Sequence, residues 1–150
     1  NLEGAFLAAK YAAPIMKAAG SGSMVFTSST AGIYGYPNRA PYAAAKWAVI
    51  GLMKTLAMEL GPFGIRANAI CPGAVEGPRM EGVLEREATA KGMTRDQVYA
   101  GYASGTSMRS FVEAADIANM AVFLASPAAR LVSGQVIAVD GHTENPDPKV

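Results

Sequence analysis

Hydrophobic residues recur at helical spacing in three parts of the chain. Near the N-terminus the apolar positions are Leu2, Phe6, Ala9, Ala13 and Met16. This period predicts a helix over Leu2–Ala19, which a Gly-Ser-Gly stretch then ends. A second stripe predicts a helix from about Pro41 to Leu60, with inward positions at Ala45, Val49, Leu52, Met53, Leu56 and Leu60. A third helix is expected over Glu113–Leu124.

Short apolar runs with the length of strands lie between these helices. They are Ser23–Thr27, Ile65–Ile70 and Gln135–Val139. The runs are unbroken rather than alternating, which is typical of strands buried on both faces of a parallel sheet. Strands that alternate with helices predict an α/β fold with right-handed crossovers and helices on both faces of the sheet.

The stretch from Arg79 to Arg109 has a weaker pattern, because charges, glycines and aromatic residues are mixed in it. We expect one or two short helices, around Glu81–Ala90 and Thr94–Tyr102. Over Gly77–Phe111, glycines permit hinge angles and methionines adapt to irregular apolar partners. We therefore expect a mobile lid here, and the alternative is a rigid surface excursion without a gating role.

Composition and charge narrow the class of protein. The chain has 150 residues, the length of one domain, and 51% of them are hydrophobic, which is enough for a core. A formal net charge of +1 argues against a nucleic-acid partner. No apolar run approaches the ~20 residues of a membrane span, and no signal-peptide pattern is seen. The single cysteine, Cys71, cannot form an internal disulfide, and the sequence has no cluster of metal ligands. These features predict a reducing compartment, most simply the cytoplasm.

The stretch with the clearest chemistry runs from Ser28 to Lys46, from the end of an apolar strand into a helix. Tyr42 and Lys46 are four residues apart and so share one face of that helix. Ser29 lies before them, across a loop that contains glycines. A hydroxyl, a phenol and an ammonium can therefore meet in one pocket, a set that suits proton transfer to or from a substrate oxygen. An ammonium beside a phenol favours the ionised form, which is the stronger base.

Ser29, Tyr42 and Lys46, with the Y-x-x-x-K spacing, resemble the catalytic set of the short-chain dehydrogenase/reductase family. Other stretches match that family in the same order: N-L-E-G at the start, I-R-A-N-A-I-C-P-G, D-I-A-N-M-A-V-F-L-A-S and S-G-Q-V-I-A-V-D-G. The resemblance covers nearly the whole chain, except the tail and part of the region from Arg79 to Arg109. It implies the C-terminal half of a Rossmann-type, doubly wound parallel sheet in three α/β/α layers.

The resemblance also implies a role for each matched residue. Tyr42 is expected to be the proton donor or acceptor, and Lys46 to hydrogen-bond the nicotinamide ribose. Ser29 is expected to donate a hydrogen bond to the substrate oxygen, with Ser28 as the competing choice. Asn1 is expected to link Lys46 to solvent through a water molecule, and the alternative for Asn1 is a helix cap.

A cofactor and a substrate follow from the same resemblance. Pro72-Gly73-Ala74-Val75 is expected to lie against the nicotinamide ring of NAD or NADP. The family usually has a threonine where this chain has Gly77, a departure that removes a hydroxyl contact to the cofactor. Gly77 and Met80 are expected to contact the substrate, a small-molecule alcohol or ketone. The reaction implied is reversible hydride transfer between the nicotinamide ring and a secondary alcohol or ketone.

Two alternatives to this function remain open. A 3-oxoacyl-carrier-protein reductase is the alternative among enzymes. The chain contains no glycine-rich phosphate-binding turn, which in the family lies before N-x-x-G. We therefore expect residues 1–150 to be the C-terminal catalytic and substrate-binding part of a single NAD(P)-binding domain. A catalytically inactive fragment, or a structural subunit without the cofactor-binding half, is the alternative from another class.

The first two helices carry small residues on more than one side, and Trp47 and Ile50 lie off the inner stripe of the second. Apolar residues outside an inner stripe indicate a partner surface. We expect a homo-oligomer, a dimer or tetramer, formed through Leu2–Ala19 and Pro41–Leu60.

Three further polar or reactive residues are expected to have structural rather than catalytic roles. Cys71 is expected to be a small buried residue rather than a nucleophile. Asn68 is expected to fix the backbone beside a strand rather than take part in chemistry. His142, the only histidine, replaces a glycine of the family's D-G-G and is expected to be structural or solvated, with a subunit contact or the rim of the site as the alternative.

Overall fold

The computed structural model of the protein describes residues 2–146. Within them the predicted helices and strands all form, with ends that differ from the expectation by a few residues. Their order is α1 (Leu2–Ala19), β1 (Gly22–Thr27), α2 (Ala40–Leu60), β2 (Ile65–Pro72), α3 (Pro78–Lys91), α4 (Arg95–Ser104), α5 (Ala114–Ala125) and β3 (Val136–Val139). The largest shift is at α3, which begins three residues earlier than predicted because Pro78 is preorganised for a first helical turn.

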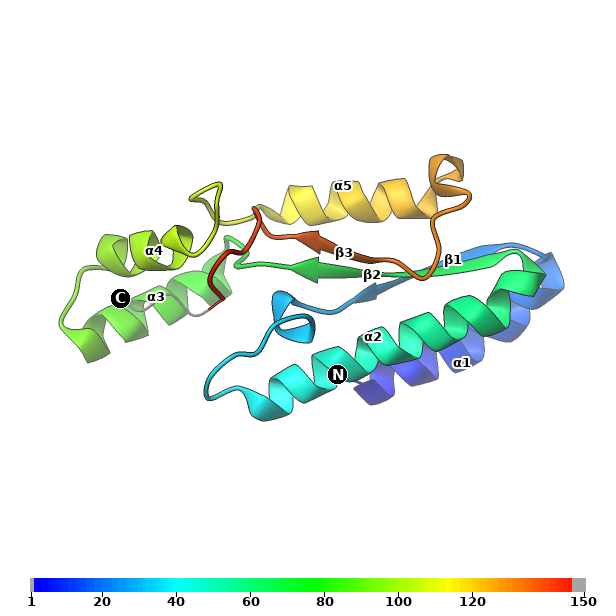
Figure 1. Cartoon of the computed structure of the whole chain (residues 1–150), viewed down its shortest axis with the longest axis horizontal. Coiled ribbons are helices and arrows are strands. Elements are labelled where there is room, and N and C mark those ends of the chain that lie inside the picture. Colours follow the sequence, from blue (N-terminus) through cyan, green and yellow to red (C-terminus); the bar gives the residue numbers. More distant parts are fainter. Residues whose placement is uncertain (1, 147–150) are drawn as a thin grey trace.

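The strands form one parallel sheet in the order β1-β2-β3, with β2 in the centre. The register runs from Gly22 opposite Ile65 in the first pair and ends with Pro72 opposite Val139 in the second. Helices α1 and α2 cover one face of the sheet and α5 covers the other (Figure 1). This arrangement confirms the three-layer α/β/α fold and the parallel sheet.

The main core lies between the sheet and the helices α1 and α2. The inner face of α2 carries Lys46, Val49, Ile50 and Met53, all buried. The prediction for Ile50 was wrong: it is 7% exposed and packs in the core instead of facing a partner. Ile50 lies four residues after the buried Lys46, so the two share the helix face that packs against the rest of the fold.

Helices α3 and α4 pack against each other as a hairpin with a hydrophobic cluster of its own, beyond the carboxyl ends of the strands (Figure 1). Leu84 and Val98 are fully buried at its centre, and the rings of Tyr99 and Phe111 stack with centroids 4.3 Å apart. An ion pair between Arg95 and Glu81 joins the two helices. The hairpin is therefore a packed unit rather than a flexible loop.

The glycines of this region do not all serve as hinges. Gly82 and Gly101 lie inside α3 and α4, so only the turn and the hairpin's ends are left for bending. Gly92 ends α3 at φ 66°, a left-handed conformation that glycine adopts without strain.

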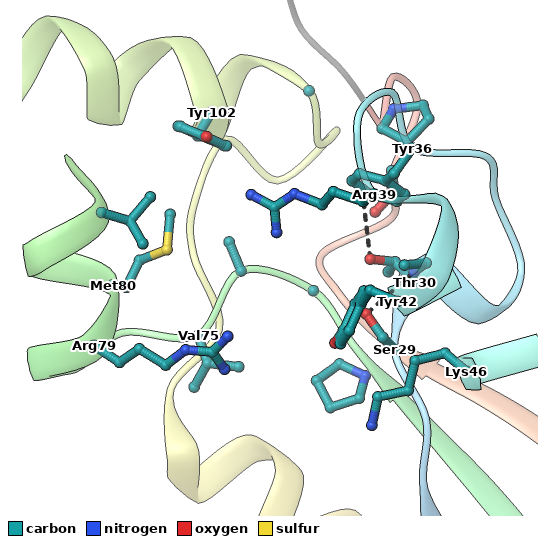
Figure 2. A pocket seen from close by; sticks show the side chains of 18 of the residues that line it. Ser29, Thr30, Tyr36, Arg39, Tyr42, Lys46, Val75, Arg79, Met80 and Tyr102 are labelled. Carbon is teal, nitrogen blue, oxygen red and sulfur yellow. Dashed lines mark hydrogen bonds between the residues drawn. The ribbon is translucent and has the colours of Figure 1, made fainter. Parts of the chain in front are cut away.

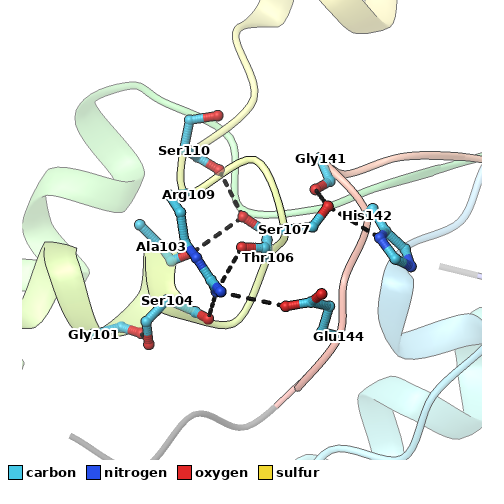
Figure 3. A network of polar contacts seen from close by, with 10 residues as sticks. All are labelled: Gly101, Ala103, Ser104, Thr106, Ser107, Arg109, Ser110, Gly141, His142 and Glu144. Carbon is cyan, nitrogen blue, oxygen red and sulfur yellow. Dashed lines mark hydrogen bonds and ion pairs between the residues drawn. The ribbon is translucent and has the colours of Figure 1, made fainter.

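The C-terminal end of the hairpin is tied to the segment that follows β3 (Figure 3). Ser107 N donates to His142 O (2.9 Å), and Glu144 N donates to Gly105 O (2.9 Å). The Arg109 guanidinium donates to Thr106 O (2.9 Å) and lies 3.6 Å from a Glu144 carboxylate oxygen. These contacts join the C-terminal end of the hairpin to the segment 142–144.

Candidate active site

A cavity of about 1310 Å³ lies at the carboxyl ends of the strands, between the α3–α4 hairpin and the connection from β1 to α2. The predicted site residues that the structure describes all line this cavity. They are Ser29, Tyr42, Lys46, Pro72, Gly73, Ala74, Val75, Gly77 and Met80. Asn1 lies outside the described residues. Figure 2 shows Ser29, Tyr42 and Lys46 on one side of the cavity and Met80 on the other.

Tyr42 and Lys46 project from one face of α2, as their spacing predicts. The Lys46 Nζ atom lies 5.7 Å from the centre of the Tyr42 ring. The same Nζ donates a hydrogen bond to Thr27 O at the end of β1 (3.0 Å), and the residue is 9% exposed. Because the Lys46 side chain is buried and its ammonium is bonded to the end of β1, its positive charge is held beside the Tyr42 phenol. One hydrogen bond within the described residues leaves two of the three ammonium protons for other acceptors.

The two neighbouring serines have different surroundings, which separates their roles. Ser28 is buried, and its hydroxyl donates to Lys46 O (2.9 Å), so that proton is already in use. Ser29 Oγ accepts a hydrogen bond from Ala31 N (3.1 Å) and caps a short 3₁₀ turn, Thr30–Gly32. The Ser29 hydroxyl proton is thus the one available toward the cavity, which favours Ser29 over Ser28 as the donor to a substrate.

A second phenol lines the same cavity, and its setting differs from that of Tyr42. The Tyr36 hydroxyl is hydrogen-bonded to Thr30 Oγ1 (2.9 Å). Burial raises the pKa of Tyr36 above its ordinary value, against a smaller lowering by Thr30. Tyr36 therefore stays protonated, and its hydrogen bond to Thr30 stabilises the loop. Tyr42 differs in that the Lys46 ammonium lies beside its ring.

The loop after β2 is held in place by the backbone on both sides. Gly73 N donates to Val139 O (3.0 Å), and an added Cβ on Gly73 would lie 3.0 Å from Asp140 Cα, so a side chain does not fit there without a shift. Val75 pairs with Val112 as an isolated parallel bridge. Gly77 ends the loop at φ 144° and ψ 173°, a conformation close to exclusive to glycine.

The bland interpretations of Asn68 and Cys71 agree with the structure. Asn68 is fully buried and joins the two flanks of a loop, since Nδ2 donates to Val132 O (2.8 Å) and Oδ1 accepts from Gln135 N (3.0 Å). Cys71 is fully buried, and burial raises the pKa of its thiol, which disfavours the nucleophilic thiolate.

His142 has a local structural role. It is exposed at φ 62°, and its Nδ1 is hydrogen-bonded to Ser107 Oγ (3.0 Å) (Figure 3). Its neighbour Thr143, rather than His142 itself, lines the cavity.

Sequence reasoning missed two arginines of the cavity wall, Arg39 and Arg79. Arg39 occupies the cap position of α2, three residues before Tyr42, and this helical spacing was an available signal. Arg79 is in the first turn of α3. A charged residue at the start of a helix is usually exposed, so nothing in the sequence indicated that this one lines a cavity.

The donor set of the cavity fits a nicotinamide nucleotide. Lys46 has ammonium protons left for a hydroxyl acceptor, and the carbonyl and N–H groups along Pro72–Val75 are of the kind that binds a carboxamide. Among residues 2–146 no group of three or more His, Cys, Asp or Glu is arranged to hold a metal ion. None of the described helices is long and apolar enough to cross a membrane.

Comparisons with known proteins give one consistent family. A family model described as Enoyl-(Acyl carrier protein) reductase matches residues 1–142. A trans-4-hydroxycyclohexanecarboxylate dehydrogenase of Sinomonas cyclohexanicum is 43% identical over 141 residues, which is 94% of this chain and 48% of that protein.

Solved structures of two reductases or dehydrogenases match the fold of this chain. The crystal structure of levodione reductase superposes with a TM-score of 0.86 at 36% identity, covering 94% of this chain and 54% of the other. NAD⁺-bound xylitol dehydrogenase gives a TM-score of 0.85 at 30% identity, covering 94% and 56%. The chain spans about half the length of the relatives it matches.

Proposed function

The chain belongs to the short-chain dehydrogenase/reductase family, and from that membership we propose that the whole protein is an NAD(P)-dependent oxidoreductase that interconverts a secondary alcohol and a ketone. One observation carries the proposal: Ser29, Tyr42 and Lys46 line one cavity with the loop Pro72–Val75. In this proposal residues 1–150 form the catalytic and substrate-binding part of a single NAD(P)-binding domain.

Each side chain has one task in the proposed reaction. In the direction of reduction, the Ser29 hydroxyl donates a hydrogen bond to the carbonyl oxygen and stabilises the negative charge that develops there. Tyr42 then gives its proton to that oxygen, and in oxidation it takes the proton back. Lys46 places its ammonium 5.7 Å from the centre of the Tyr42 ring, beside the group that gives up the proton.

A nicotinamide nucleotide, NAD or NADP, supplies the hydride acceptor or donor. In the proposal Lys46 binds its ribose and Pro72–Val75 binds the ring, while Gly77 and Met80 contact the substrate. The backbone of this loop is paired at Val75 with Val112. The surface that would bind the nicotinamide ring is therefore already formed before the cofactor arrives. The proposed role of Asn1 in a proton relay rests on the resemblance alone.

The test is an activity assay of the full-length protein without an affinity tag. Turnover is measured for a panel of secondary alcohols and ketones, with NAD and with NADP. The first compound is 4-oxocyclohexanecarboxylate, because the relative from Sinomonas cyclohexanicum is a trans-4-hydroxycyclohexanecarboxylate dehydrogenase. We expect absorbance changes of the reduced nicotinamide that depend on both cofactor and substrate. Absence of turnover across the panel with either cofactor would favour the inactive or structural alternative.

A 3-oxoacyl group on an acyl carrier protein is the second candidate substrate. A 3-oxoacyl-(acyl-carrier-protein) reductase of Thermotoga maritima, 38% identical over 141 residues, favours it. Direct competition of a 3-oxoacyl carrier protein with a small ketone in the same assay separates the two, since the preferred substrate has the higher kcat/KM.

The same proposal includes a homo-oligomer, a dimer or tetramer. Phe6, Tyr11 and Ile15 of α1 and Trp47 of α2 are more than half exposed, at 51, 68, 72 and 53%. Large apolar side chains left open on adjacent helices favour a twofold pairing of these faces. We also propose a reducing compartment, most simply the cytoplasm, because the buried Cys71 is unpaired.

A further inference from the structure

Two guanidinium groups face the cavity from opposite walls. Arg39 stands at the start of α2, on the side of Tyr42 and Tyr36, and Arg79 stands on the first turn of α3. Figure 2 shows both side chains extending into the space between α3 and the Ser29–Tyr42 wall, with their charged ends turned toward the middle. Two positive groups thus converge on the region in front of the proposed proton donor.

Within residues 2–146, neither acidic residue of the cavity wall, Glu76 or Glu87, forms an ion pair with these arginines. Glu76 accepts a hydrogen bond from Tyr99 (2.9 Å). Glu87 pairs with Lys91 (2.5 Å) and accepts a hydrogen bond from the Tyr102 hydroxyl (2.7 Å). Both carboxylates therefore have partners from the hairpin itself.

The two arginines have no such partner. Within residues 2–146, neither the Arg39 nor the Arg79 side chain makes a hydrogen bond or an ion pair; Arg39 acts on Glu87 only as a charge at longer range, a weaker influence on the Glu87 pKa than the Lys91 hydrogen bond. A guanidinium presents five donors in a planar fork, and its natural complement is a carboxylate or phosphate group. An anion brought in by a ligand would supply the complement that these guanidinium groups lack.

We propose that Arg39 and Arg79 bind a carboxylate on the substrate, so that the protein acts on alcohols and ketones that carry an acidic group. The inference rests on the proposed function, because it takes the substrate oxygen to lie at Ser29 and Tyr42. The carbon skeleton then crosses the apolar stretch of the wall formed by Val75, Met80 and Val83. The carboxylate fixes which end of the molecule faces the arginines and which end reaches the proton donor.

The size of the effect follows from exposure and charge. A hydrogen bond to a charged group corresponds to a factor of about 10 to 100 in affinity. Both arginines are exposed at the edge of the cavity, where water and salt screen the interaction. We therefore expect the lower part of that range, about 10-fold, on removing either guanidinium.

Two probes of matched shape isolate the carboxylate: 4-oxocyclohexanecarboxylate and 4-oxocyclohexanecarboxamide. Each is titrated calorimetrically into the full-length protein in the presence of oxidised cofactor, with which a ketone does not react. We expect the carboxylate to bind about 10-fold or more tighter than the amide. Arg39→Gln and Arg79→Gln should each remove most of that preference and leave the affinity for the amide unchanged. Arg39→Lys, which keeps a charge without the fork, should lose less than Arg39→Gln.

Arg86→Gln is the matched control, because Arg86 is an exposed arginine of the same helix α3 that does not line the cavity. It should leave both affinities as in the wild type. Carboxylate binding no tighter than amide binding, or a preference that survives both substitutions, would overturn the proposal. If Arg79→Gln weakens the cofactor alone and leaves the preference intact, the anion at that arginine is a cofactor phosphate and the proposal is wrong.

The titration does not depend on turnover, so it separates this inference from the proposed function. A protein that prefers the carboxylate but turns over no alcohol or ketone of the panel with either cofactor would refute the oxidoreductase function and keep the anion site. Reduction of both probes with equal kcat/KM would do the reverse.

Discussion

The glycine at position 77 gives the sharpest quantitative prediction, because two opposing terms can be worked out for one substitution. The family usually has a threonine here, and a threonine hydroxyl would add a contact to the cofactor. One such hydrogen bond is worth about 0.5–1.5 kcal/mol net. Gly77, however, is at φ 144° and ψ 173°, where any residue with a Cβ costs about 1–3 kcal/mol.

The backbone term is the larger of the two. No heavy atom lies within 4 Å of a Cβ added at Gly77, so the penalty arises from backbone conformation and not from a clash. Taking about 2 kcal/mol for strain and about 1 kcal/mol for the hydroxyl, Gly77→Thr should lose about 1 kcal/mol in total. Gly77→Ala has the strain without the hydroxyl and should lose about 2 kcal/mol.

Two measurements on the full-length protein capture the loss wherever it falls. If the loop relaxes in the free protein, cofactor affinity falls by about 5-fold for the threonine variant and about 30-fold for the alanine variant. If the loop stays in place, both variants lose the strain of about 2 kcal/mol from unfolding stability, and the threonine variant binds the cofactor about 5-fold tighter. Cofactor titration and denaturant unfolding are therefore summed for each variant. Tighter cofactor binding by Gly77→Thr without loss of stability would refute the reasoning, because it would mean that the backbone here accepts a side chain.

Three more predictions concern the hairpin and the assembly. On binding of cofactor and substrate analogue to the full-length protein, hydrogen exchange should slow at the loops 73–77 and 105–112 and change little inside α3 and α4, which are already packed; unchanged exchange in both loops would rule out a lid. The Arg95 hydrogen bond holds the pKa of Glu81 below its ordinary value, so its stabilisation of the hairpin is present above the ordinary carboxyl pKa and is lost as pH falls through the lowered one. Protection from exchange in α4, taken relative to the intrinsic rate at each pH, should therefore fall in acid in the wild type and show a smaller pH response in Glu81→Gln; an equal response in both would contradict this. Light scattering at micromolar concentration should give a dimer or tetramer, and a monomeric mass would reject the proposed pairing of α1 and α2.

The periodic segments were predictable because tertiary packing follows the same apolar stripe that the sequence displays. Helix α1 has the predicted bounds, and the apolar runs became the three parallel strands, although only β2 is largely buried. The phase of α2 was less predictable. Lys46 was expected to face the site, but its burial with the ammonium bonded to Thr27 O at the end of β1 was not foreseen. That contact joins residues nineteen positions apart and has no trace in local periodicity.

The residues of the candidate site also divide into those that local spacing predicts and those that only the tertiary fold brings together. Ser29, Tyr42 and Lys46 were found because their spacing on one strand end and one helix face is local. Arg39 and Arg79 were not, because only the placement of the α3–α4 hairpin across from α2 brings two surface-type charges to one cavity. The hairpin itself was underestimated: glycines at positions 82 and 101 looked like hinges but lie inside helices that share a hydrophobic cluster.

The central claim is that Tyr42 carries the proton, and the most direct test is Tyr42→Phe in the full-length protein. The substitution removes one hydroxyl and little volume, and the Lys46 anchor on Thr27 O does not depend on it. Proton transfer by a positioned group contributes about 10²–10⁴-fold, so kcat should fall by at least 100-fold while cofactor affinity and unfolding stability stay close to wild type. Tyr36→Phe is the control, since Tyr36 is the other phenol described in the loop before α2 that lines the cavity, and it should keep most of the activity. A Tyr42→Phe protein that retains more than about a tenth of the wild-type rate would contradict the account.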